Sequence, residues 1–149
     1  MIEFTVHGEA KPAGSKRAFR NQHTGRIQLV DASGKKGANW RARVAHEAKE
    51  AMNGRPLLDG PLVLKAMFVR ARPKSHYGTG KNKDVLKPTA PAWPTTRPDT
   101  TKLLRAVEDS LSSVIYHDDS QIVTQIATKV YGDPPRVEII VTELEPDTA

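Results

Sequence analysis

Three aspartates in the C-terminal half of the chain, Asp99, Asp118 and Asp119, have the residue type and the setting for hard-metal chemistry. Asp99 precedes an amphipathic stretch, and the adjacent pair Asp118 and Asp119 follows it. Mg²⁺ prefers oxygen ligands and is usually held by one or two carboxylates together with substrate phosphates. Nucleases use such an ion to activate water and to stabilise the leaving oxygen. Acids grouped in an otherwise basic chain therefore indicate metal chemistry on a polyanion, which is typical of a nuclease.

Charge is distributed unevenly along the 149 residues, whose net charge is +6. Residues 1–98 contain 19 Lys and Arg against 7 Asp and Glu, whereas residues 99–149 contain 4 against 10. A basic surface of this kind would bind phosphates with a steep salt dependence. Because a positive charge of this size also serves solubility, charge alone leaves nucleic-acid binding and simple solubility as open alternatives.

Composition narrows the class of protein. The length predicts a single domain, residues 1–149, with enough chain to bury a core unaided. The chain has no cysteine, which excludes thiol catalysis and cysteine zinc sites and fits a reducing cytosol. No apolar run approaches the roughly 20 residues that span a bilayer, and the N-terminus resembles a strand and not a signal peptide. We therefore expect a soluble protein without a membrane partner.

The apolar pattern predicts an α+β fold with one mixed β-sheet and two main helices, in the order β-β-α-β-α-β-β. Strands are expected at residues 2–7, 26–30, 62–71, 120–131 and 136–144. The last two strands are expected to form a hairpin around residues 132–135. The first helix is expected from Trp40 to Met52, with Gly54 as its C-cap.

The second helix, expected at residues 99–114, has the clearest pattern. Its apolar side chains share one face of a helical wheel with about 100° per residue: Leu103, Leu104, Val107, Leu111 and Val114. The polar side chains that lie away from this face are Lys102, Arg105, Glu108 and Asp109. Asp99 is placed to cap the helix.

Residues 72–97 are expected to form a basic loop that is rich in proline and glycine. A loop of this length inside a compact domain is usually functional or disordered. The cations of this loop that are expected to contact DNA are Lys74, Lys81, Lys83 and Arg97. Further DNA contacts are expected from Lys11, Lys16, Arg17, Arg20, Arg41 and Lys102.

Each acid also has an ordinary structural explanation. Asp99 is a common N-cap residue, and Asp118 and Asp119 suit a turn. Asp109 would pair with Arg105 on the helix surface, worth a few tenths of a kcal/mol. A helix of about 16 residues is about 24 Å long. The pair would therefore meet Asp99 only if the next strand ran back along the helix, or if a dimer partner supplied it.

The stretches 97–105, 109–111 and 116–123 resemble the RusA family of Holliday junction resolvases, which are common in phages and prophages. The family pattern is roughly Pro-Asp-x-Asp-Asn/Lys-Leu-x-Lys/Arg, then Asp-x-Leu, then Asp-Asp-x-Gln-Val, and its spacing matches without gaps. The resemblance implies a homodimeric endonuclease that depends on Mg²⁺, or on Mn²⁺ in its place, without a small-molecule cofactor. It implies paired nicking of four-way DNA junctions in recombination, repair or phage DNA processing, in the cytoplasm of a bacterial cell or a phage-infected host.

By position, the resemblance implies that Asp99 and Asp119 are catalytic metal ligands, with Asp118 as the neighbouring acid. Arg105 occupies the place of a catalytic lysine and would stabilise charge on the phosphoryl oxygens. The family's second aspartate is replaced by Thr101, whose hydroxyl brings no charge. The alternatives are therefore a branched-DNA-binding protein with weakened or lost catalysis, and a basic protein that binds RNA.

Overall fold

The computed structural model describes residues 1–14, 16–31 and 34–145, and leaves the side chains of residues 16, 17, 19 and 28–31 undescribed. One mixed sheet has the strand order β1-β6-β4-β5. Its strands are β1 (Ile2–His7), β4 (Leu62–Arg70), β5 (Ile122–Tyr131) and β6 (Arg136–Glu143). β4 and β5 are parallel, whereas β6 is antiparallel to both β1 and β4. The predicted α+β class with one mixed sheet is therefore confirmed.

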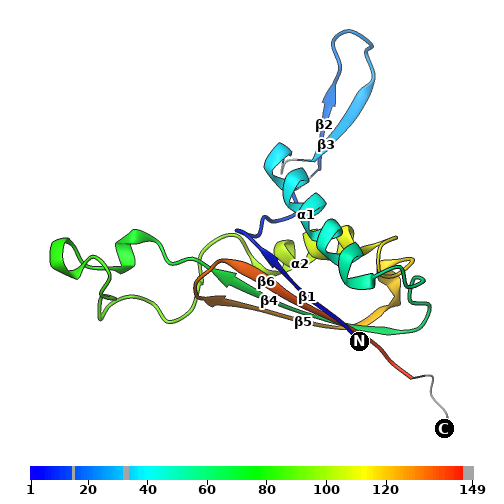
Figure 1. Ribbon diagram of the computed structural model, residues 1–149. Helices are drawn as coiled ribbons and strands as arrows, with labels where there is room; N and C mark the ends of the chain where they lie inside the picture. Colours follow the sequence, from blue (N-terminus) through cyan, green and yellow to red (C-terminus); the bar gives the residue numbers. More distant parts are fainter. Residues whose placement is uncertain (15, 32–33, 146–149) are drawn as a thin grey trace.

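Two helices, α1 (Gly34–Met52) and α2 (Thr100–Leu111), cover the same face of this sheet (Figure 1). α1 contacts β1 and α2, and α2 contacts the edge strand β5. The expected apolar spacing of the first helix is confirmed, because its buried side chains include Trp40, Val44, Ala48 and Met52. The helix nevertheless begins six residues before Trp40, at Gly34.

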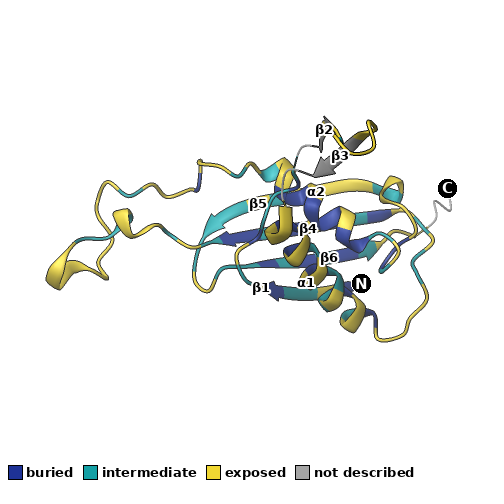
Figure 2. Ribbon diagram, turned by 90° about the horizontal axis from the view of Figure 1, so that it is seen from above, coloured by how far each residue is buried: buried dark blue, intermediate teal, exposed yellow. Residues whose placement is uncertain are grey.

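The core lies between the helices and the sheet (Figure 2). Alternate residues of β4 and β6 point into it, as the period of two of a β-strand requires. Fully burying an aliphatic or aromatic side chain contributes about 1.5–3 kcal/mol. The side chains of these two strands that belong to the main core are Leu62, Leu64, Ala66, Phe68, Val137, Ile139 and Val141.

The expected hairpin of the last two strands is wrong, because β4 lies between β5 and β6. Their connection instead crosses the end of β4. The Gly132 N–H donates to the Arg70 carbonyl at 3.0 Å, and a Cβ on Gly132 would lie 2.7 Å from the Val69 side chain. The strongly apolar β4 is stabilised by a neighbour on each side, which leaves no unpaired edge at the centre of the core.

The second helix is shorter than expected and ends at Leu111. Ser113 adopts a positive φ of 67°, which turns the chain away from the helix axis. The Tyr116 hydroxyl donates to the Glu108 carbonyl at 2.8 Å and so satisfies a carbonyl of the last turn. Val114 still packs against the core from the turn that follows.

Two segments project from the body of the molecule (Figure 1). One is the hairpin of β2 (Lys16–Arg20) and β3 (Ile27–Asp31), whose first strand adds to the predicted order. The other, here called the arm, comprises residues 71–98 and contains two short 3₁₀ turns at Lys74–His76 and Gly80–Asn82. No described helix is long and apolar enough to cross a membrane.

Candidate active site

Asp99 is the N-cap residue of α2, as its position before the helix predicted. Its side chain accepts a hydrogen bond from the Lys102 N–H at 2.8 Å, and the Lys102 Nζ lies 3.7 Å from its second oxygen. The Asp99 side chain is 57% exposed, so the cap leaves one oxygen open to solvent and ligands. Capping and binding are therefore compatible at this residue.

A cleft of about 660 Å³ opens beside Asp99. Four cations and two acids line it, drawn from the segment after β1, the end of β4, the end of the arm and the start of α2: Lys11, Arg70, Arg97, Lys102, Glu9 and Asp99. Arg70 is held in place because its guanidinium donates to the Ala10 carbonyl at 2.7 Å. Burial lowers the pKa of Arg70, and the nearby Glu9 partly opposes that shift. The excess of cations suits this cleft to phosphate groups.

The pair Asp118 and Asp119 lies at the far end of α2, where a 3₁₀ turn (Asp119–Gln121) leads into β5. The Asp118 side chain accepts from the Ser120 N–H at 3.1 Å. This hydrogen bond and one shared with Asp119 lower the pKa of Asp118. The same shared bond, then desolvation and repulsion, raise the pKa of Asp119. The two carboxylates thus form one electrostatic unit with an exposed face.

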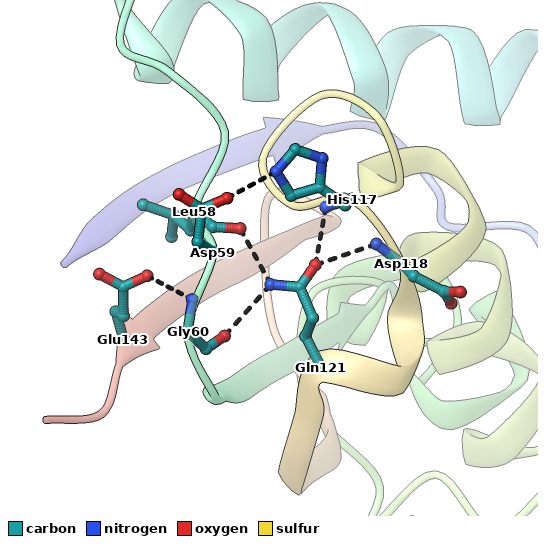
Figure 3. Close-up of polar contacts among 7 residues, drawn as sticks. All are labelled: Leu58, Asp59, Gly60, His117, Asp118, Gln121 and Glu143. Carbon is teal, nitrogen blue, oxygen red and sulfur yellow. Dashed lines mark hydrogen bonds and ion pairs between the residues drawn. The ribbon is translucent and has the colours of Figure 1, made fainter. Parts of the chain in front are cut away.

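Gln121 holds this turn in place (Figure 3). Its Oε1 accepts from the backbone N–H groups of His117 at 2.8 Å and Asp118 at 3.0 Å. Its Nε2 donates to the carbonyls of Leu58 at 2.9 Å and Gly60 at 3.1 Å. All four hydrogen-bonding positions of the amide are used. The side chain thus ties the acidic turn to the segment that leads into β4.

His117 and Asp59 reinforce the same junction. The His117 Nε2 lies 2.7 Å from the Asp59 Oδ1, and both side chains are exposed. Glu143 fixes the other side, because its carboxylate accepts from the Gly60 N–H at 2.9 Å. The sequence left Asp118 and Asp119 open between turn residues and metal ligands, and the structure shows that they lie in a turn braced by the segment that leads into β4 (Figure 3).

A groove of about 180 Å³ runs between α2 and β5, lined by Thr100, Thr101, Leu104, Arg105, Glu108, Gln125 and Ala127. Thr101 and Arg105 lie four residues apart and so share one helix face. Arg105 is exposed. The expected Asp109–Arg105 pair does not occur among the ion pairs of the described residues, and the charge of Arg105 acts on Glu108.

Glu108 is the residue that sequence reasoning misplaced. The helical wheel put it on the polar side of α2, but only 9% of the residue is exposed and its carboxylate accepts from the Gln125 side chain. Burial raises the pKa of Glu108, the Gln125 hydrogen bond opposes this, and the charge of Asp119 adds to it. The signal that could have found it is a polar residue, Gln125, on the strand face that meets α2.

The structure does not bring Asp99 to the Asp118–Asp119 pair within one chain. Asp99 caps the first turn of α2, whereas Asp119 acts electrostatically on Glu108 in its last turn. Nine residues of helix separate the two places by about 13 Å. β5 does run back along α2, but the residue that it places near the start of α2 is Lys129. The Lys129 Nζ donates to the Pro98 carbonyl at 2.9 Å.

The donor chemistry at the acidic turn fits a hard cation only in part. Carboxylate oxygens are the ligands that Mg²⁺ and Mn²⁺ prefer. Among residues 1–14, 16–31 and 34–145, however, no three acidic, histidine or cysteine side chains are placed to hold an ion together. The chain therefore offers a pair of carboxylates that needs further oxygen ligands, such as substrate phosphates.

The predicted DNA-binding cations whose side chains are described occupy four regions: the cleft, the arm, β2 and α1. Lys11, Arg97 and Lys102 line the cleft beside Asp99. The exposed side chains of Lys74, Lys81 and Lys83 lie on the arm. Arg20 is exposed on β2, and Arg41 is half-buried on α1. The side chains of Lys16 and Arg17 lie outside the described part of the structure.

Comparison with known proteins assigns this architecture to a family. The family model for endodeoxyribonuclease RusA matches residues 9–142. An uncharacterized protein of Bacillus subtilis (strain 168), YqaN, is 32% identical over 145 residues, which cover 96% of each chain. The crossover junction endodeoxyribonuclease RusA of Lactococcus phage r1t is 42% identical over 53 residues, which cover 35% of this chain and 40% of the phage protein. The chain belongs to the RusA family of endodeoxyribonucleases.

Proposed function

We propose that this protein is a divalent-metal-dependent endonuclease that resolves four-way DNA junctions by paired nicking, in the cytoplasm of a bacterial cell or phage-infected host. The observation that carries the proposal is the braced acidic turn, which presents Asp118 and Asp119 beside a groove that contains Arg105. Membership in a family of junction-resolving nucleases supports the same reaction class.

Asp119 and Asp118 would hold the cation at the acidic turn, and Asp99 would supply a further carboxylate. A bound Mg²⁺ or Mn²⁺ would supply a polarised water and would neutralise charge on the scissile phosphate. Gln121 contributes by fixing the backbone of the turn, so that the carboxylates are oriented before DNA arrives.

Arg105 would donate to the non-bridging oxygens of the scissile phosphate. Its guanidinium is exposed at the groove and is a fixed cation with planar donors. It therefore suits charge stabilisation and not proton donation. Thr101, one turn earlier, would add at most a hydrogen bond from its hydroxyl.

The DNA backbone would follow the cations of the cleft, the hairpin and the arm. Phosphate contacts from Lys11, Arg97 and Lys102 would position the strand next to Asp99 without reading its sequence. The arm and hairpin project far enough from the body to reach other branches of a junction (Figure 1).

A two-fold homodimer would complete the site. Within one chain about 13 Å of helix separates Asp99 from Glu108, the residue of α2 on which the charge of Asp119 acts. A partner subunit that places its own Asp99 beside this turn would supply the missing ligand at both sites at once. Two equivalent sites would also match the two equivalent strands that paired nicking requires.

Cleavage of a synthetic four-way junction tests the proposal. Wild-type protein with Mg²⁺ should give symmetric nicks, and Asp119→Asn should reduce the rate by at least about 100-fold, since even indirect support of a metal ligand is worth about 10–100-fold. Glu50→Gln, an exposed acid of α1, is the matched control. No cleavage by wild type, or equal cleavage by Asp119→Asn, would contradict the proposal.

A second candidate function is junction binding with weak or lost catalysis, which the absence of a carboxylate at Thr101 favours. It predicts tight binding without nicking, and gain of nicking by Thr101→Asp. Competition with duplex RNA in the same binding assay distinguishes an RNA-binding protein, for which RNA would displace the junction efficiently.

A further inference from the structure

The arm combines charge with exposed apolar surface. Between residues 72 and 97 it contains six lysines and arginines and one acid, Asp84. Three large apolar side chains of the arm are exposed: Val85 by 56%, Leu86 by 43% and Trp93 by 60%. The other tryptophan of the chain, Trp40, is buried at 3% exposure. An exposed indole in a cationic segment indicates a polyanionic partner that also has apolar surface.

The base of the arm is held firmly. The Arg72 guanidinium lies 4.4 Å from the centre of the Tyr131 ring and donates to the Pro91 carbonyl at 2.7 Å. The His76 ring meets the edge of the same tyrosine at 5.3 Å. These contacts connect the outgoing and the returning chain segments of the arm to the end of β5.

Trp93 lies between two of these fixed points. Pro91 is bound through its carbonyl, and Pro94 is buried. Two residues further on, the Thr96 carbonyl accepts from the Lys129 Nζ at 3.0 Å. The backbone on each side of Trp93 is therefore anchored, and the exposed ring is presented at a fixed place at little further entropic cost.

In the sequence, Trp93 lies close to residues that line the cleft beside Asp99. Arg97, four residues later, lines that cleft together with Asp99. Pro94 and Arg97 also line a second hollow of about 170 Å³. A strand whose phosphates occupy the cleft would thus carry its bases past the exposed ring.

Phosphates alone cannot cover an indole, whereas a base can stack on it. In linear duplex DNA the bases are already paired and stacked on one another. At a branch point some bases have lost a stacking neighbour. We propose that Trp93 is a stacking platform for a base at the branch point of the DNA, and that it gives preference for branched over linear DNA. This inference rests on the proposed function.

Binding measured in an Asp119→Asn background, in which cleavage is expected to be at least about 100-fold slower, tests the inference. Trp93→Ala should weaken binding to a four-way junction by about tenfold or more, the usual range for one lost base stack. Trp93→Phe, which keeps an aromatic face, should restore most of it. Binding to linear duplex, and the slope of log Kd against log salt, should stay unchanged for both variants.

Two controls separate stacking from charge and from general apolar contact. Lys83→Gln should weaken junction and duplex binding alike and lower the salt slope by about one. Val85→Ala removes exposed apolar surface elsewhere on the arm and should leave the junction preference intact. Trp93 is the only exposed tryptophan in the described part of the chain, so quenching of its fluorescence by junction DNA gives a direct readout.

The outcomes are distinguishable. Equal weakening of junction and duplex binding by Trp93→Ala, or no weakening, would overturn the inference about Trp93 but leave the proposed function standing. Sedimentation that shows Trp93→Ala dissociating a dimer would assign the ring to a subunit interface and would also overturn it. A wild-type protein without any junction preference would overturn the proposed function, and the inference with it.

Discussion

At the scale of single residues, Glu108 is the one buried acid of the described part of the chain. Only 9% of the Glu108 residue is exposed, so its carboxylate loses hydration, which the hydrogen bond from Gln125 only partly replaces. Burial accordingly raises the pKa of Glu108. A folded state that holds a proton more tightly than the unfolded state loses stability as pH rises above the unfolded pKa, near 4.3. The ionised Glu108 is therefore expected to destabilise the folded protein at neutral pH.

Glu108→Gln should consequently raise the melting temperature at pH 7.5, and the gain should shrink as the pH falls to 4 and below, where Glu108 becomes protonated in both states. A rise of about 2–4 °C corresponds to each kcal/mol relieved in a chain of this size. Thermal unfolding across this pH range is the measurement, with Glu50→Gln as the exposed control. A gain that is independent of pH would show that burial of the charge is not its cause.

Gln121 offers the opposite case, a polar group whose hydrogen bonds are all made. Gln121→Ala should lower the free energy of unfolding by about 2–4 kcal/mol, since four hydrogen bonds contribute about 0.5–1.5 kcal/mol each and are not fully additive. Gln121→Glu keeps the acceptor for His117 and Asp118 but places oxygen against two carbonyls, so it should cost as much. Urea unfolding measures both, and a loss below about 0.5 kcal/mol would contradict the bracing role.

The role of Asp99 as a helix cap was the most predictable part of this site. Asp99 as a helix cap followed from its place before an apolar period, and the structure confirms it. The helical wheel did not reveal the burial of Glu108, because a wheel describes one helix and Glu108 is buried by the neighbouring strand. The role of Gln121 escaped for a similar reason, since its partners Leu58 and Gly60 lie about 60 residues away.

At the scale of elements, α2 depends on Asp99 in two separable ways. Asn caps helices about as well as Asp, whereas Ala loses about 1 kcal/mol. Asp99→Asn should therefore keep the stability within about 0.5 kcal/mol while removing the negative charge, and Asp99→Ala should lower stability by about 1 kcal/mol. Both should lose metal-dependent cleavage if Asp99 binds the cation.

Denaturant unfolding and junction cleavage, measured on the same samples, separate the two roles of Asp99. Full activity of Asp99→Asn would reduce Asp99 to a cap. Ser110→Ala is a suitable control on the same helix, because its hydroxyl bonds only to the Ala106 carbonyl, at 2.7 Å, among the described residues.

Most elements were predictable, because apolar periodicity is a local property. The order in which the strands pair was not predictable, since it depends on which strand is most apolar and is therefore buried at the centre of the sheet. β4 has the strongest apolar pattern and takes the centre, which places β5 and β6 on opposite sides although only residues 132–135 connect them. Gly132 allows this close crossing, because a Cβ at this position would lie 2.7 Å from the Val69 side chain.

At the scale of the whole molecule, the separation of Asp99 from the acidic turn makes a prediction about assembly. If the partner subunit supplies Asp99, neither Asp99→Asn nor Asp119→Asn homodimers contain an intact site. A mixed dimer of the two variants contains one intact site and one that lacks both groups. Co-refolding equal amounts should yield half mixed dimers, hence about a quarter of the wild-type sites.

The products distinguish this arrangement sharply. A dimer with one intact site should nick one strand of the junction and leave the opposite strand uncut, so nicked junctions should accumulate in place of resolved duplexes. Differently tagged subunits allow the mixed dimer to be purified and assayed alone. Absence of any cleavage by the purified mixed dimer would show that Asp99 and Asp119 of the same chain act together, which would require α2 or the acidic turn to move when DNA binds.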